Sequence, residues 1–144
     1  MTDEFLKLGY WELKKLTGED EYIRKELEAN DIQEYSTQVS YEEYIFDAAE
    51  LGYTEIFIEL IERFDYDPNS DSNLLFQIVS SLGHSEMVDY LLKDSRVDPS
   101  DENNVAIEWA SLNKHKNIVE KLLTDQRVVT SLSKEKIEEY RCQV

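Results

Sequence analysis

The stretch Leu82–Pro99, LGHSEMVDYLLKDSRVDP, returns in altered form as Asn113–Thr130, NKHKNIVEKLLTDQRVVT. A more diverged copy, LGYTEIFIELIERFDYDP, precedes both at Leu51–Pro68. One position marks the same point in all three copies and recurs every 31 residues (83−52 and 114−83): Gly52, Gly83 and Lys114. A period between about 20 and 50 residues is typical of stacked solenoids, in which each unit packs against its neighbours. The repeat therefore predicts a stack of similar units.

Each unit contains two short amphipathic segments. In the segment that follows Ser85, apolar residues recur at a spacing that places them on one face of a helix: Met87, Val88, Leu91 and Leu92. Pro99 prevents this helix from continuing. An apolar segment that begins at Leu74 precedes it, with Ser72 or Asn73 as its expected N-cap. We expect helices at residues 41–51, 54–64, 73–82, 85–93, 104–112, 116–124 and 133–141.

These units resemble the ankyrin repeat, a helix–turn–helix of about 33 residues with a finger loop between neighbours. The paired alanines, the Gly-His turn and the double leucine of that family correspond in one unit to Ala48-Ala49, Gly52-Tyr53 and Leu60-Ile61. The next two units carry Gly83-His84 with Leu91-Leu92, and His115 with Leu122-Leu123. The resemblance covers about residues 41–130. The loop sequences are similar to those of divergent ankyrin arrays encoded by large DNA viruses and phages. The resemblance implies an all-α, ankyrin-like helix–turn–helix solenoid with short finger loops.

The resemblance also implies a domain organisation. We expect a single ankyrin-repeat domain over residues 1–144, with residues 1–40 as a degenerate first unit and N-terminal cap. The repeats are expected at 41–72, 73–103 and 104–130, and residues 131–144 are expected to form a C-terminal capping helix. The Thr-Pro-Leu-His opening of the family's inner helix is absent from these units. We therefore expect stacking to depend more on apolar contact than it does in the family at large.

The charge of the chain is strongly acidic and unevenly distributed. The net charge of −17 divides into −14 for residues 1–72 (20 acidic and 6 basic) and −3 for residues 73–144 (12 acidic and 9 basic). Seven of the nine tyrosines also fall in the first half. Tyrosines interspersed with carboxylates would complement a basic partner. Such a chain is not expected to bind nucleic acid directly, since Lys and Arg are the residues that neutralise phosphates.

No arrangement of residues indicates catalysis or metal binding. The two histidines, His84 and His115, recur one period apart (115−84 is 31), so the repeat accounts for their position. The four glycines are isolated and form no phosphate-binding loop. The finger-loop carboxylates lack the spacing of a calcium-binding loop, and an acidic hydrolase built on paired carboxylates is disfavoured. We expect no enzyme activity, no cofactor and no metal.

The resemblance implies that a protein partner lies against the concave face made by inner helices and finger loops. Mapped onto this chain, that face comprises Tyr41, Glu42, Tyr44, Glu50, Leu51, Asn69, Ser70, Asp71, Asn73, Ser81, Leu82, Asp101, Glu102, Asn104, Leu112 and Asn113. We expect a non-catalytic interaction module that binds a basic protein through this face and its acidic, Tyr-rich first half. The alternative is a viral or phage counter-defence inhibitor that mimics nucleic acid on a nucleic-acid- or nucleotide-handling enzyme.

The remaining expectations concern the compartment and the oligomeric state. The chain has no apolar run near the roughly 18 residues that a membrane span needs, and its start resembles no signal peptide. Cys142 is its single cysteine, which excludes an internal disulfide. We therefore expect a cytoplasmic protein, in the host cytoplasm if it is viral, that contacts no membrane and is a monomer when unbound.

Overall fold

The computed structural model describes residues 41–144, apart from the side chains of Tyr41, Glu43 and Tyr44. Within that range it contains helices and no strand: α3 (Tyr41–Leu51), α4 (Thr54–Phe64), α5 (Ser70–Leu82), α6 (Ser85–Leu92), α7 (Asp101–Leu112), α8 (Lys116–Leu122), α9 (Gln126–Ser131) and α10 (Lys134–Gln143). The expected all-helical solenoid is confirmed. The expected first unit and cap, residues 1–40, lie outside the described residues.

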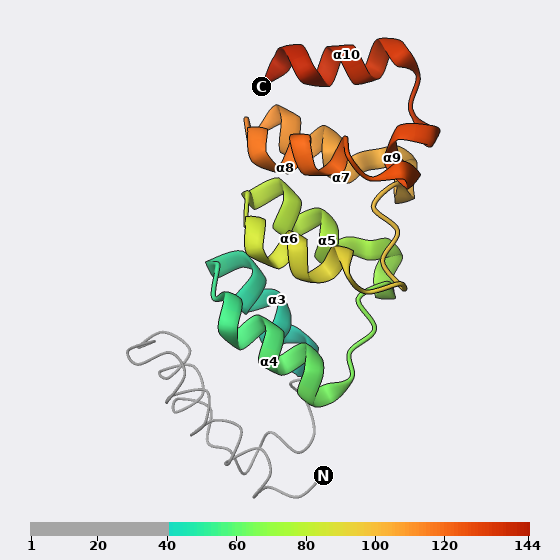
Figure 1. Cartoon of the computed structure of the whole chain (residues 1–144). Helices are drawn as coiled ribbons and strands as arrows, with labels where there is room; N and C mark the ends of the chain where they lie inside the picture. The colour runs from blue at the N-terminus through green and yellow to red at the C-terminus, as the bar shows by residue number, and fades with distance from the viewer. Residues whose placement is uncertain (1–40) are drawn as a thin grey trace, which may run out of the picture.

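The helices stack as antiparallel pairs. Figure 1 shows α3/α4, α5/α6 and α7/α8 in successive layers, with α10 covering the α7/α8 layer. The short turns inside each pair lie along one side of the stack, and the longer loops between pairs lie along the other side with α9. We call α3, α5 and α7 the inner helices and α4, α6 and α8 the outer helices.

The turn within each pair requires a left-handed backbone at one position. Gly52 and Gly83 have φ angles of 78° and 80° there, and Lys114 takes the same position in the third pair with φ 64°. Glycine adopts this conformation without a steric penalty, whereas a residue with a Cβ, such as Lys114, adopts it at a steric cost. The period of 31 residues is thus a repeat of backbone geometry as well as of sequence.

The inner helices α5 and α7 begin with a left-handed turn. Residues 71–73 have φ angles of 51° to 57°, and residues 102–104, one period later, have φ angles of 50° to 64°. Right-handed helix therefore starts at Leu74 and Val105, one residue after the expected starts. Asn73 does not cap its helix as expected, because its side chain points to the next loop.

The core is a continuous layer between inner and outer helices. Leu91 and Leu122, which occupy the same repeat position, are fully buried, as the apolar spacing predicts. Burial at one position after each outer helix also follows the period: Tyr66 and Val97 in loops and Val128 in α9 are 3%, 1% and 0% exposed. These side chains pack into the core and hold the segments between pairs against the stack.

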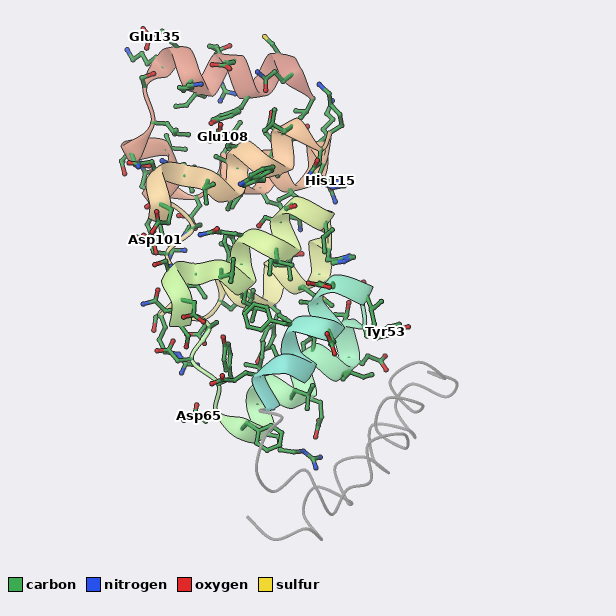
Figure 2. The ribbon with its side chains drawn as sticks, turned by 180° about the vertical axis from the view of Figure 1, so that it is seen from behind. Tyr53, Asp65, Asp101, Glu108, His115 and Glu135 are labelled. Carbon is green, nitrogen blue, oxygen red and sulfur yellow. The ribbon has the colours of Figure 1, made fainter. Side chains whose placement is uncertain are left out.

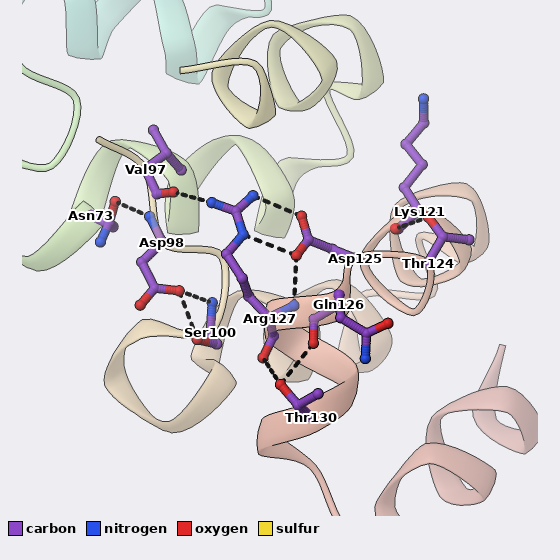
Figure 3. A network of polar contacts seen from close by, with 10 residues as sticks. All are labelled: Asn73, Val97, Asp98, Ser100, Lys121, Thr124, Asp125, Gln126, Arg127 and Thr130. Atoms are coloured by element: carbon purple, nitrogen blue, oxygen red, sulfur yellow. Dashed lines mark hydrogen bonds and ion pairs between the residues drawn. The ribbon is translucent and has the colours of Figure 1, made fainter. Parts of the chain in front are cut away.

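Polar contacts also join successive pairs. The Lys121 ammonium lies 2.5 Å from an Asp89 carboxylate oxygen and so joins α8 to α6. The Ser111 hydroxyl lies 2.7 Å from the Gln143 side-chain oxygen and joins α7 to α10. Figure 3 shows a third contact, in which the Arg127 guanidinium reaches the Val97 carbonyl in the preceding loop.

Helix α9 was not expected from the sequence. It occupies residues whose counterparts one period earlier form a loop, and Thr130 stands where that loop has Pro99 (130−31 is 99). Without proline the backbone can continue as helix. The Asp125 side chain begins α9 by accepting a hydrogen bond from the Arg127 amide, at 2.9 Å.

Candidate binding face

The inner helices present the most acidic surface of the stack. α3, α5 and α7 contain no lysine or arginine and eight acidic residues, whereas of the outer helices α4 and α8 contain basic residues and α6 has no basic and two acidic residues. The acidic residues of α3, α5 and α7 are Glu42, Glu43, Asp47, Glu50, Asp71, Asp101, Glu102 and Glu108. Figure 2 looks onto this side, with α3, α5 and α7 in front and Glu108 labelled on α7. We call the exposed side chains of these three helices the inner-helix face.

Large apolar side chains are exposed on the same face. The described residues include five large hydrophobic side chains of which at least 40% is exposed, and all five belong to inner helices: Leu51 (44%), Leu74 (41%), Leu82 (42%), Trp109 (48%) and Leu112 (59%). Scattered exposed leucines are ordinary on protein surfaces. Their confinement to one set of helices is the informative observation, since grouped apolar exposure marks interaction surfaces.

These apolar residues form two rows. On α5, Leu74, half-buried Ile78 and Leu82 are spaced i, i+4, i+8, which places them along one side of the helix. We call this row the α5 ridge. On α7, half-buried Val105, Trp109 and Leu112 follow the spacing i, i+4, i+7 and form the α7 ridge. The first two residues of the ridges correspond one period apart, Leu74 to Val105 and Ile78 to Trp109 (105−74 and 109−78 are 31), whereas Leu112 corresponds to Ser81.

The first inner helix breaks this pattern with charge. Asp47 on α3 takes the repeat position of Ile78 and Trp109 (78−47 is 31). Glu50, one turn further along α3, is exposed and takes the position of Ser81 and Leu112. At these two repeat positions the inner-helix face is therefore acidic on α3 and uncharged on α5 and α7, although Leu51 is exposed on α3 and Glu108 on α7.

The negative charge extends to the loop beside α3. Burial raises the pKa of Tyr66 above its ordinary value, and the carboxylates of Glu42, Asp71 and Asp67 raise this pKa further. The Ser70 hydroxyl opposes them with a hydrogen bond that lowers the Tyr66 pKa. Three carboxylates acting on one phenol indicate a concentrated negative potential at this end of the described stack.

The segments that follow α6 and α8 each contain an arginine–aspartate pair, so they do not share this concentration of negative charge. Hydrogen bonds from Arg96 lower the pKa of Asp94, and hydrogen bonds from Arg127 lower the pKa of Asp125, although partial burial opposes both shifts. The two pairs lie one period apart (127−96 and 125−94 are 31). Figure 3 shows Arg127 held between Asp125 and the Val97 carbonyl. Because these guanidiniums bind within the protein, they add little positive charge that could repel a basic partner.

The structure places the expected partner-binding residues in four groups. Nine are exposed: Glu42, Glu50, Leu51, Asn69, Asp71, Leu82, Glu102, Leu112 and Asn113. Ser70, Ser81 and Asp101 are half-buried, and Asn73 and Asn104 are buried. Tyr41 and Tyr44 belong to α3, but their side chains lie outside the described part of the chain.

Asn73 and Asn104 bind to neighbouring loops within the stack. The Asn73 amide donates to the Asp101 carboxylate at 2.7 Å, and its oxygen accepts from the Asp98 amide at 3.3 Å. One period later, the Asn104 amide donates to the Ser131 hydroxyl at 2.9 Å. At 1% and 4% exposure these side chains offer a partner no surface. We therefore leave both out of the proposed binding residues.

Sequence reasoning missed Leu74, Ile78 and Trp109 as surface residues. The alignment of the repeats contains the evidence for their exposure. Ile78 and Trp109 align with charged Asp47, and a position that tolerates charge faces solvent. An apolar residue at such a position is exposed in the stack. Apolar spacing within α5 and α7, read without this alignment, does not separate the exposed residues from the core.

The two histidines pack between the turns of successive helix pairs. A Cβ atom on Gly52 would lie 2.9 Å from His84 Cε1, and one on Gly83 would lie 2.6 Å from His115 Cε1. Each imidazole thus packs over the glycine of the preceding turn. Among residues 41–144 no group of three or more His, Cys, Asp or Glu side chains is placed to hold a metal ion. In the same range no helix combines the length and apolar character needed to cross a bilayer.

Paired helices in register, glycine turns and loops on one side define an α-solenoid. Residues 45–131 match the family model described as ankyrin repeats in three copies, which is more than half of the 144 residues. The chain belongs to the ankyrin repeat family, whose members are typically non-catalytic modules for protein–protein interaction. No curated protein and no solved structure was found to match the chain.

Proposed function

We propose that this protein binds another protein through the inner-helix face, and that the partner places basic side chains around an apolar contact. One observation carries the proposal. The exposed large apolar side chains among the described residues are confined to α3, α5 and α7, and these helices contain no basic residue. Interface cores are apolar and rich in aromatic residues, and charge around them selects the partner.

Trp109 is the expected energetic centre of this contact. It lies in the α7 ridge beside Leu112 and is 48% exposed, which leaves a large apolar area for a partner to cover. Tryptophan is the residue type most enriched among those that dominate binding energy. The charges of Asp47, Glu50 and Glu108 contribute to association rate and selectivity more than to affinity.

A second candidate function is inhibition by mimicry of nucleic acid. The net charge of −17 and the absence of basic residues on the inner helices favour it. A counter-defence inhibitor of viral or phage origin would be one setting for such a function. The exposed Trp109 and Leu112 favour the first candidate. A groove that binds phosphates does so through lysine and arginine, and large apolar side chains would gain little from contact with those charges.

The test is capture of the natural partner by the whole chain from the cells that contain it. We expect Trp109→Ala with Leu112→Ser to abolish capture, while the circular dichroism spectrum keeps its helical signal. The matched control changes Glu86→Ala and Asn117→Ala, two exposed outer-helix residues that share one repeat position (117−86 is 31). Capture that survives the first pair of changes would place the interface elsewhere. Competition by DNA or RNA for the captured partner would favour mimicry.

A further inference from the structure

We propose that the partner presents an amphipathic α-helix, which lies along the α5 and α7 ridges with its basic flank toward α3. The proposal rests on the proposed function and specifies the element that the face accepts. Three features of the face support the proposal: the direction of its apolar rows, the hydrogen bonding of its backbone within the helices, and the unequal charge of its two edges.

The apolar rows run along the inner helices. On α5 the ridge from Leu74 to Leu82 spans eight residue-to-residue steps of helix, or about 12 Å at 1.5 Å per residue. In the perpendicular direction, across the stack, a partner would meet Asp47 before Ile78 and Trp109. One turn further it would meet Glu50 and Ser81 before Leu112. Leu51 and Leu82 form an apolar row across two helices, but the equivalent position on α7 is Asn113. A row of three apolar side chains is therefore available only to an element that lies parallel to α5 and α7.

The backbone of the face is already hydrogen-bonded. Among residues 41–144 no strand edge is present, and the inner-helix amides and carbonyls are used within the helices. An extended peptide over this surface would leave its own amides without protein partners. A helix satisfies its backbone internally and needs only side-chain contact. Its residues at i, i+3, i+4 and i+7 would interlock with the two ridges.

The two edges of the face differ in charge. On the α3 edge, Asp47 and Glu50 are acidic, and α3 carries no basic residue. On the opposite edge, α10 has three basic residues, Lys134, Lys136 and Arg141, and three acidic residues, Glu135, Glu138 and Glu139. Glu108 on α7 adds one exposed carboxylate near α10, so the α10 edge is close to neutral, whereas the α3 edge is acidic. A bound helix would therefore gain more from lysine or arginine on its α3 flank than on its α10 flank. This asymmetry predicts which flank of the partner helix is more basic.

The probe is a designed peptide of about 18 residues with leucine at i, i+3, i+4 and i+7 and lysine along one flank. Such a peptide is only partly helical alone, so helix formation on binding is measurable by circular dichroism. The first comparison peptide has the same composition in an order that destroys the apolar face. The second has glutamate in place of lysine. Affinities for the whole chain are measured by calorimetry.

We expect the patterned peptide to gain helical signal and to bind at least about tenfold more tightly than either comparison peptide. Trp109→Ala should weaken its binding at least about tenfold, since interface tryptophans dominate binding energy, and Trp109→Phe should restore most of the loss. Asp47→Asn with Glu50→Gln should remove the advantage of lysine over glutamate. Changing Glu86→Gln on the outer helix α6 should leave that advantage intact.

The results separate this inference from the proposed function. The helical mode is overturned if the reordered peptide binds as tightly as the patterned one, or if no peptide binds while natural partner capture still depends on Trp109. The proposed function survives both of those results. If Trp109→Ala changes neither peptide binding nor partner capture, the inner-helix face is not the interface and both conclusions fall.

Discussion

The Arg127 guanidinium donates a hydrogen bond to the Val97 carbonyl, with an Nη1–O distance of 2.7 Å, and so ties the start of α9 to the loop of the preceding repeat. The same guanidinium binds Asp125 through Nε and Nη2, at 3.0 and 2.7 Å. One side chain thus joins a helix cap to the neighbouring repeat. In the preceding loop, Arg96 binds Asp94 in the same way, but its other close partners are the carboxylates of Asp65 and Asp67, at 3.8 and 3.9 Å.

Removal of Arg127 should therefore cost more stability than removal of an ordinary surface arginine. Arg127→Ala is expected to lower the free energy of unfolding by about 1 to 2 kcal/mol, because hydrogen bonds from charged donors are worth about 1.5 to 3 kcal/mol and this side chain is partly screened. The control is Arg141→Ala, whose exposed pair with Glu138 should contribute about 0.5 kcal/mol or less. Equal shifts in the urea midpoint would contradict the assignment.

The Asp125 carboxylate should make stability depend on pH. Hydrogen bonds from Arg127 lower its folded-state pKa from the ordinary value of 3.8. A group with a lowered folded pKa stabilises the fold fully above its unfolded pKa, and the contribution is lost as pH falls through the folded pKa. Asp125→Asn keeps a capping oxygen but removes the charge. We expect the variant to be less stable than the wild type at pH 7, with the difference shrinking as pH falls below about 4 and through the lowered folded-state pKa.

The matched control for that experiment is the same change in an Arg127→Ala background. There the carboxylate has lost the guanidinium that lowers its pKa. The stability effect of Asp125→Asn should then be smaller at pH 7 and depend less on pH, because only the backbone amides of residues 127 and 128 still lower the carboxyl pKa. Urea unfolding followed by circular dichroism at several pH values measures the effect in both backgrounds. A pH dependence that is the same in the two backgrounds would show that Arg127 is not its cause.

Leu91→Ala should destabilise the stack strongly. Leu91 is fully buried in the middle pair, with neighbouring pairs on both sides, so its truncation loses transfer free energy and leaves a cavity. We expect a loss of about 2 to 5 kcal/mol, measured as the shift in free energy of urea unfolding. Exposed Lys93→Ala, two residues further along the chain, is the control and should change stability by about 0.5 kcal/mol or less. Comparable midpoints for the two variants would refute the assignment of the core face.

Gly83→Ala tests the turn and its histidine together. The new Cβ would combine a left-handed φ of 80° with a clash against the His115 ring. The backbone alone should cost about 1 to 2 kcal/mol, and the clash should add to it. In a His115→Ala background only the backbone cost should remain, so the two changes should be non-additive in thermal unfolding. Strict additivity would mean that the imidazole does not pack over this glycine.

Partner binding should weaken as salt rises. Between about 0.05 and 0.5 M salt, exposed charges such as Glu50 and Glu108 become screened, because the Debye length is about 10 Å at 0.1 M and shorter above it. The association rate should fall more than the dissociation rate rises. Neutralising Asp47, Glu50 and Glu108 as Asn, Gln and Gln should flatten the salt dependence while retaining part of the affinity. An unchanged slope would place the electrostatic contact on another surface.

The sequence alone was sufficient to predict the helical pairs. The period of 31 residues located Gly52, Gly83 and Lys114, and apolar spacing identified Leu91 and Leu122 as core, because both signals are regular spacings along the chain. The absence of basic residues from the inner helices is likewise visible in the printed chain. These properties depend on local spacing, which a one-dimensional pattern records.

Tertiary structure decided which polar and apolar residues are available at the surface. Asn73 and Asn104 were predicted to contact a partner but are buried, because their bonding partners, Asp98, Asp101 and Ser131, lie 25 to 28 residues away in the next loop. Trp109 was not predicted and is exposed, because the position of α7 between its neighbours covers one side of that helix and leaves the other open. Periodicity shows that a helix has two faces; only the packing of the neighbouring repeats determines how much of each face remains in solvent.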